Sequence, residues 1–165
     1  MSHEWHYENG VMLKAIERVW QKSGEAKYFQ FIHDTLDQFI EPDGNIRTYR
    51  LMEYNLDQIN MGKALFPVWR ATGDERYKRA AFLLREQLIW QPRTREGGFW
   101  HKHIYPYQMW LDGIYMGCAF LAEFAEIFNE PGAFDEVAFQ IVTVEKHMRD
   151  PKTGLLYHGW DESKK

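Results

Sequence analysis

Residues 111–119 read Leu-Asp-Gly-Ile-Tyr-Met-Gly-Cys-Ala, and residues 56–64 read Leu-Asp-Gln-Ile-Asn-Met-Gly-Lys-Ala. Six of the nine positions are identical, so the two stretches look like copies of one unit. A third segment fits the same frame more weakly, through Glu8, Met12 and Ala15. Self-similarity of this kind indicates a repeat architecture.

Glycines occur at the expected turns of each repeat unit. Short segments that suit a turn followed by extended backbone occupy residues 43–49, 96–101 and 153–158. Their turn glycines are Gly44, Gly97 and Gly154. Three further glycines precede the second helix of each unit: Gly24, Gly73 and Gly132. Because glycine accepts backbone angles that reverse the chain, each unit is predicted to be a helix, a tight turn, a second helix and an extended return.

Apolar residues recur with helical spacing in six segments, and strand-like alternation is scarce. The segments are residues 8–22, 25–40, 53–71, 74–90, 112–129 and 133–149. Residues 112–129 are apolar almost all round, which suits an inner helix, whereas residues 74–90 are rich in charge, which suits an outer one. We therefore predict an all-α protein. Its residues 1–165 form a single domain of three αα-hairpins, half of an (α/α)6 toroid; a solenoid of stacked hairpins is the alternative.

The bulk composition narrows the classes of partner and location. A net charge of −4 argues against broad binding to nucleic acids or anionic membranes. No apolar run approaches the ~20 residues of a membrane helix. The one cysteine, Cys118, cannot form a disulfide within the chain, which suits a reducing compartment. We expect a cytoplasmic protein.

The repeat predicts that chemically useful side chains meet at one opening. Asp57 and Asp112 stand near the starts of inner helices, as Glu8 does, while Tyr49, His101 and His158 stand in the returns. Each aspartate could simply cap its helix. However, each lies in an apolar run with an aromatic nearby, and burial of a carboxyl group raises its pKa. Two such acids on adjacent helices suit acid/base catalysis.

The stretch from His101 to Trp110 combines hydrogen-bond donors, a cation and flat rings. A zinc site made by His101, His103 and Asp112 is one interpretation, but the spacing matches no strong zinc motif, and we expect no metal. Binding of a hydroxylated anion fits better, because His101 and Lys102 supply donors and Trp110 supplies a stacking face. A plain surface loop is the third alternative.

Several motifs together resemble glycoside hydrolase family 105, the unsaturated rhamnogalacturonyl hydrolases, and more distantly family 88, the unsaturated glucuronyl hydrolases. The motifs lie in residues 53–57, 92–102, 108–113 and 153–161. The resemblance implies an (α/α)6 barrel of about twice this length. It implies action on a Δ4,5-unsaturated galacturonyl residue of a pectin-derived oligosaccharide, with no cofactor or metal.

The resemblance also implies roles for individual residues. Asp112 matches the acid that protonates C4 of the enol-ether double bond and helps to activate water for C5. The substrate contacts implied are Asp57, His101, Lys102, Trp110 and His158.

Other classes of function remain open from the sequence. One is a helical-repeat module that binds protein or sugar without catalysis. Another is a different α/α-toroid enzyme, such as a sugar epimerase. Because three hairpins are half of a closed toroid, we expect a fragment or truncated product whose apolar inner face promotes self-association.

Overall fold

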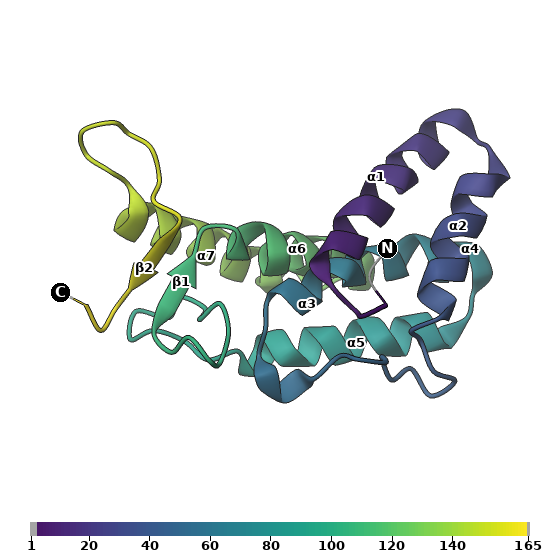
Figure 1. Ribbon diagram of the computed structural model, residues 1–165, viewed down its shortest axis with the longest axis horizontal. Helices are drawn as coiled ribbons and strands as arrows, with labels where there is room; N and C mark the ends of the chain where they lie inside the picture. Colours follow the sequence, from purple (N-terminus) through teal and green to yellow (C-terminus); the bar gives the residue numbers. More distant parts are fainter. Residues whose placement is uncertain (1–2, 165) are drawn as a thin grey trace. The chain divides into compact units, whose positions relative to one another are not determined.

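The computed structural model describes residues 3–164 and is built mainly from helices (Figure 1). The α-helices are α1 (Tyr7–Ser23), α2 (Ala26–Asp37), α3 (Asp57–Asn60), α4 (Leu65–Thr72), α5 (Glu75–Trp90), α6 (Ala119–Phe128) and α7 (Gly132–Met148). Short 3-10 turns cover Leu51–Glu53 and Met61–Ala64, and a π turn covers Ile114–Cys118. The two strands within residues 3–164 are β1 (Gln108–Trp110) and β2 (Gly159–Asp161). The all-α class is confirmed.

The chain divides into two compact units. The first unit contains residues 3–49 and Gln58–Glu86, and the second contains Arg50–Asp57 and residues 87–164. The single-domain organisation expected for residues 1–165 stays a prediction. Within the described residues, no helix combines the length and apolar character needed to cross a membrane.

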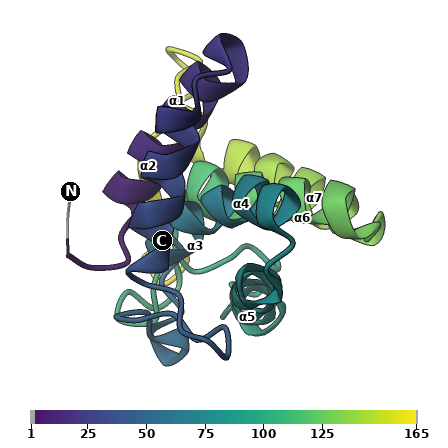
Figure 2. The ribbon, with the colours of Figure 1, turned by 90° about the vertical axis from the view of Figure 1, so that its right-hand side faces the viewer.

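In the first unit, α1 and α2 form a helical hairpin and lie side by side in both ribbon views (Figures 1 and 2). Gly24 ends α1 with φ 69°, and the Trp20 and Phe29 rings meet across the turn at 4.9 Å. The core of this unit includes the fully buried Leu13, Ile32 and Leu36. Burial of such side chains against neighbouring helices supplies most of the stability of a hairpin this short.

In the second unit, α6 and α7 form the equivalent hairpin, and the small sheet lies beside α7. Strands β1 and β2 are antiparallel and place Trp110 opposite Gly159. Met109, Val144 and Met148 form a buried cluster beneath the sheet. Each strand has three residues and its partner is distant in sequence, so the alternating pattern is too short to predict the pairing.

The repeated returns adopt one geometry. Gly44, Gly97 and Gly154 have φ values of 91°, 95° and 72°. Around each of them an isolated antiparallel bridge closes the turn: Ile40 with Ile46, Arg93 with Phe99, and Arg149 with Leu156. The helix–turn–helix–return unit predicted from the sequence is therefore present three times.

The third hairpin departs from the predicted glycine pattern. Gly24 and Gly73 take the left-handed conformation at the ends of α1 and α4, but Asn129, with φ 54°, does so at the end of α6. Gly132 instead begins α7. Asparagine tolerates the left-handed region better than most residues, which explains the replacement.

The inner helices also carry local irregularities that the sequence pattern did not predict. The expected helix over residues 53–71 begins only at Asp57 and is interrupted by the 3-10 turn. Pro67 has no N–H to donate to the Lys63 carbonyl. The series of α-helical hydrogen bonds is therefore interrupted at the 3-10 turn of Met61–Ala64. From Asp112 to Asn129 the chain has one residue more than from Asp57 to Gly73, and the π turn accommodates it.

Replacing Gly44 by alanine should lower the free energy of unfolding by at least about 2 kcal/mol, because φ is positive there. The new Cβ would also lie 2.5 Å from the Cβ of Arg79. Gly132→Ala is the matched control: no described atom lies within 4 Å of its added Cβ. Urea denaturation of both variants checks this, and equal losses would contradict it.

Candidate active site

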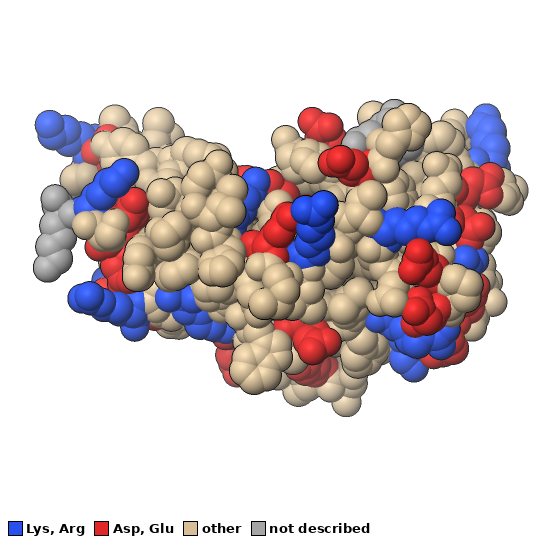
Figure 3. Space-filling view, turned by 60° about the horizontal axis from the view of Figure 1, so that its bottom comes forward, with Lys and Arg blue, Asp and Glu red and all other residues tan. Residues whose placement is uncertain are grey.

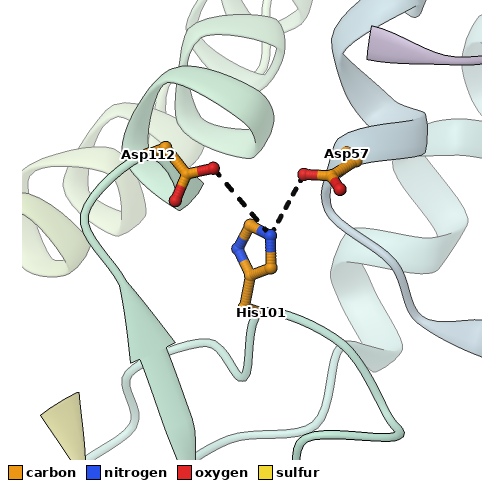
Figure 4. Close-up of side chains that lie close together, drawn as sticks. All are labelled: Asp57, His101 and Asp112. Atoms are coloured by element: carbon orange, nitrogen blue, oxygen red, sulfur yellow. Dashed lines mark hydrogen bonds and ion pairs between the residues drawn. The ribbon is translucent and has the colours of Figure 1, made fainter. Parts of the chain in front are cut away.

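Asp57, His101 and Asp112 meet in the second unit (Figure 4). Asp57 is the first residue of α3, Asp112 precedes the π turn, and His101 rises from the intervening loop toward both carboxyl groups. One oxygen or nitrogen of each side chain lies within 4.8 Å of the others. The predicted approach of the two aspartates is thus observed.

Asp57 is the buried member of the group, with 9% of its side chain exposed. Its Oδ1 accepts a hydrogen bond from Nε2 of His101 at 3.0 Å, and its Oδ2 lies 2.7 Å from Nζ of Lys102. Burial alone would raise the pKa of Asp57, but the hydrogen bonds and positive charges of His101 and Lys102 outweigh it and lower that pKa. The raised pKa expected for Asp57 is therefore wrong, and this residue is an ionised anchor.

His101 is fully buried and is held by both its backbone and its ring. Its N–H donates to the Gln108 carbonyl at 2.8 Å, and its carbonyl accepts from the Leu56 N–H at 3.0 Å. Its ring stacks on Trp110 with centroids 4.3 Å apart and planes 11° apart. Nδ1 has no hydrogen-bond partner among the described residues, and because Asp57 is ionised, Nε2 is the nitrogen that donates the hydrogen bond to it.

The residue after Asp112 is a glycine for a spatial reason. A Cβ at Gly113 would lie 3.4 Å from Nδ1 of His101 and 3.2 Å from Cδ1 of Leu56. The contact with Leu56 is tighter than ordinary packing, and the contact with His101 is at the limit of ordinary packing. Gly113 therefore lets the backbone that carries Asp112 approach Leu56 and the His101 ring closely.

Asp112 is the accessible carboxyl group. About a third of its side chain, 34%, is exposed. Its Oδ2 lies 4.0 Å from Nε2 of His101 and its Oδ1 lies 3.9 Å from Nε2 of His158, both beyond hydrogen-bonding distance. Oδ1 is itself buried and has no hydrogen-bond partner within residues 3–164. The exposed part of the Asp112 side chain can meet a ligand, whereas both oxygens of Asp57 are engaged.

The sheet brings the remaining predicted residues to the same place. The Leu111 N–H donates to the His158 carbonyl at 2.7 Å, next to the pair of Trp110 and Gly159. The His158 ring lies 5.6 Å from that of Trp110, and 71% of the His158 side chain is exposed. Lys102 Nζ lies 5.8 Å from the Trp110 ring. The structure thus assembles Asp57, His101, Lys102, Trp110, Asp112 and His158.

Trp110 has ring contacts that the sequence did not indicate. Besides His101, it stacks with Tyr105 at 5.2 Å, and its Nε1 donates to Oε1 of Gln108 at 3.1 Å. A ring engaged in this way holds the His101 ring in its orientation. Glu8 and Tyr49 belong to the first unit, so the opening predicted for them together with the other four residues stays a prediction.

The carboxyl and imidazole groups of Asp57, His101 and Asp112 are chemically able to hold a metal ion. However, Lys102 already neutralises Oδ2 of Asp57, and a divalent ion would have to compete with that ammonium group. His103 is outside this group: its N–H donates to the Glu53 carbonyl and its ring meets Tyr54. The described residues therefore do not assemble the alternative zinc set of His101, His103 and Asp112.

Acidic and basic side chains are interspersed on the face shown in Figure 3. This mixture agrees with the modest negative net charge.

Comparison with known proteins gives the family. A model of Glycosyl Hydrolase Family 88 matches residues 1–165. The chain belongs to Glycosyl Hydrolase Family 88. Among curated proteins, this family 88 chain is 24% identical over 167 residues to the unsaturated rhamnogalacturonyl hydrolase YesR of Bacillus subtilis (strain 168), covering 98% of the chain and 46% of YesR.

Solved structures confirm the fold. A family 105 glycoside hydrolase from C. acetobutylicum ATCC 824 superposes with a TM-score of 0.96 at 46% identity, covering 99% of this chain and 46% of that one. A possible family 105 member from Klebsiella pneumoniae gives a TM-score of 0.85 at 24% identity, covering 97% and 41%. The predicted resemblance and the α/α-toroid class are confirmed, and the chain spans less than half the length of these relatives.

Proposed function

We propose that the protein carrying this family 88 chain hydrolyses Δ4,5-unsaturated uronyl oligosaccharides derived from pectin, of the galacturonyl-rhamnose type. The observation that carries the proposal is the contrast between the two aspartates. Asp112 is partly exposed and its buried Oδ1 has no hydrogen-bond partner among the described residues, beside an Asp57 whose charge is already matched by Lys102 and His101. The similarity to YesR, itself named as an unsaturated rhamnogalacturonyl hydrolase, supports the substrate class.

In the proposed reaction, Asp112 acts as general acid and then general base. Its carboxyl proton goes to C4 of the enol ether, and the π electrons of the double bond form the new C–H bond. Positive charge develops at C5 and is shared with the ring oxygen. A water molecule adds its oxygen to C5 and returns a proton to Asp112. The C5 hemiketal then opens by breaking the bond between C5 and the ring oxygen, which leaves a ketone at C5 and a hemiacetal at C1. Collapse of that hemiacetal to an aldehyde breaks the glycosidic C1–O bond, and the neighbouring sugar leaves with the hemiacetal proton on its oxygen.

The surrounding groups suit an anionic substrate. A uronyl ring carries a carboxylate, and Lys102 and His158 stand close to Asp112 or its partners. The ionised Asp57 keeps Lys102 and His101 in fixed positions, so these groups need no reorganisation when the substrate binds. A partly exposed lysine and an exposed histidine can both contact a ligand from the solvent side of the site.

The proposal is tested with an unsaturated galacturonyl-rhamnose disaccharide. Hydration of the double bond should remove the enol-ether absorbance, and product analysis should find one equivalent of free rhamnose. A persistent absorbance in the protein that carries this chain would refute the proposal. Loss of absorbance without rhamnose release would instead indicate a different α/α-toroid enzyme.

Replacing His158 by alanine should raise KM about tenfold with a smaller change in kcat, because an exposed contact of about 1.4 kcal/mol is lost mainly from substrate binding. Stability should change little, since the side chain is mostly exposed. Steady-state kinetics and thermal denaturation check both expectations. His103→Ala, outside the group of catalytic candidates, is the matched control.

The cytoplasmic location is part of the same proposal. Cys118 is buried, and burial raises the pKa of its thiol to about 12, so the thiol is not reactive toward oxidants. A chain with a single inert thiol requires no oxidising compartment to fold. Fractionation of the source cells tests the location.

A further inference from the structure

Gln91 is a buried glutamine that directly follows α5 and is not among the catalytic candidates. It is 3% exposed. Its Nε2 donates to the Tyr54 carbonyl and to the Trp100 carbonyl, both at 2.7 Å. Its Oε1 accepts a hydrogen bond from Nε2 of Gln87 at 3.0 Å. Because a primary amide has two N–H groups and both are used here, the two carbonyls fix the orientation of the Gln91 side chain.

The two carbonyls belong to the two segments that carry the site. Trp100 directly precedes His101, and Tyr54 lies three residues before Asp57. Both segments belong to the second unit, as Gln91 does. The acceptors lie 9 and 37 residues from Gln91 in the sequence, so the amide does more than end α5. One side chain thus holds the approach to Asp57 and the approach to His101 at the same time.

The backbone at Tyr54 needs such a hold. Its φ of 43° and ψ of 45° are left-handed values that a residue with a bulky side chain rarely adopts. Conformations of this kind persist only where the surrounding structure fixes them. The hydrogen bond from Gln91 to the Tyr54 carbonyl is one fixing contact, and the hydrogen bond from the His103 N–H to the Glu53 carbonyl at 3.0 Å is another.

The contacts between the two segments at the site tolerate little movement. Nε2 of His101 donates to Oδ1 of Asp57 at 3.0 Å, and Nζ of Lys102 lies 2.7 Å from Oδ2 of the same carboxylate. A separation of the segments by about 1 Å would take both pairs of atoms out of hydrogen-bonding distance. The spacing that Gln91 maintains is therefore the spacing on which these contacts depend.

We propose that Gln91 is a positioning residue of the site, which holds the Asp57 segment and the His101 segment at the distance that their side-chain hydrogen bond requires. Gln91 acts through the Tyr54 and Trp100 carbonyls, not on a reacting group. Its effect on turnover rests on the proposed hydrolase function. Its effect on the hydrogen bond between His101 and Asp57 does not.

Nuclear magnetic resonance of the Nε2–H proton of His101 tests the positioning directly in the protein that carries this chain. This proton is buried and hydrogen-bonded, so it should be protected from exchange with water. Its signal is assigned by its loss in His101→Gln. Gln91→Met keeps the length of the side chain but has no N–H, and in this variant the signal should be lost through exchange with water.

Gln140→Met is the matched control. Gln140 is 2% exposed and also makes three hydrogen bonds, with Phe99, Gly97 and Glu136. None of these three partners lies on the Asp57 segment. Gln140→Met should therefore lose stability, measured by thermal denaturation, but keep the His101 signal. Gln91→Asn, whose amide is one methylene shorter and falls short of the carbonyls, is the second variant if Gln91→Met does not fold.

Steady-state kinetics on the unsaturated disaccharide measures the consequence for turnover. Gln91→Met should lower kcat by about 10- to 100-fold, because a misplacement of about 1 Å in a catalytic site has an effect of that order. Gln140→Met should leave kcat close to that of the unmodified protein.

An unchanged His101 signal in Gln91→Met would overturn the proposal. So would an equal loss of that signal in Gln140→Met, because it would show a general loosening of the fold. If the unmodified protein does not hydrate the disaccharide, the hydrolase function fails, and the His101 signal still decides the role of Gln91.

Discussion

Asp112→Asn should lower kcat on an unsaturated galacturonyl-rhamnose disaccharide by about 10²- to 10⁴-fold, the range of general acid/base catalysis. The amide of asparagine has nearly the shape of the carboxyl group but cannot deliver a proton to C4. Asp112 has no hydrogen-bond partner for Oδ1 among the described residues, so the substitution should leave the fold intact. The initial rate of loss of enol-ether absorbance measures the effect.

The control for this prediction separates catalysis from general loss of charge. Asp135→Asn makes the same chemical change at an exposed position on α7 and should leave kcat unchanged. Calorimetric binding of the disaccharide to the Asp112→Asn variant should remain detectable. A rate loss below tenfold for Asp112→Asn would remove this residue from the role of acid.

Asp57→Asn should destabilise the protein by about 3 kcal/mol at neutral pH, because it leaves Lys102 and His101 without their charged partner in a buried site. The pKa of Asp57 is lowered in the folded protein below the ordinary value of 3.8. Its ionised form therefore contributes stability above that ordinary value, and the contribution is lost as the pH falls through the lowered pKa. The difference in free energy of unfolding between the wild-type and Asp57→Asn proteins should therefore become smaller in strong acid.

Urea denaturation at neutral pH and well below pH 3.8 measures this difference. Lys102→Met is the companion variant, since it keeps an apolar stem but removes the ammonium group from Oδ2. It should raise the pKa of Asp57, because burial then meets less opposition. A destabilisation by Asp57→Asn of equal size at both pH values would show that the ion pair is not its cause.

These two aspartates also show how far sequence reasoning reached. The repeat placed Asp57 and Asp112 in equivalent positions, and the structure brings them together with His101. The sequence could not separate their chemistry. Lys102 and His101 reach Asp57 from a loop more than forty residues away, and only those contacts lower the pKa of Asp57 where apolar neighbours alone predicted a raised one.

The contacts of Trp110 also could not be predicted from the sequence. Its place beside Asp112 indicated a ligand-stacking ring, and that role stays a prediction. The structure adds that Trp110 packs on His101 and Tyr105, a contact set by the turn between residues 101 and 110. The pairing of β1 with β2 brings His158 to this turn. The sequence could not predict this pairing, because each strand has only three residues.

By itself the sequence determined the all-α class, the three hairpin units, their glycine returns and the family to which the chain belongs, because helical periodicity and the left-handed glycine are local properties of the backbone. Only the tertiary structure decided which aspartate is ionised and held and which is open. It also decided that Asn129 rather than Gly132 ends an inner helix, and that a π turn absorbs an extra residue. Those outcomes depend on which charges and side chains meet through space, and electrostatic and packing energies depend on distances that the order of residues does not contain.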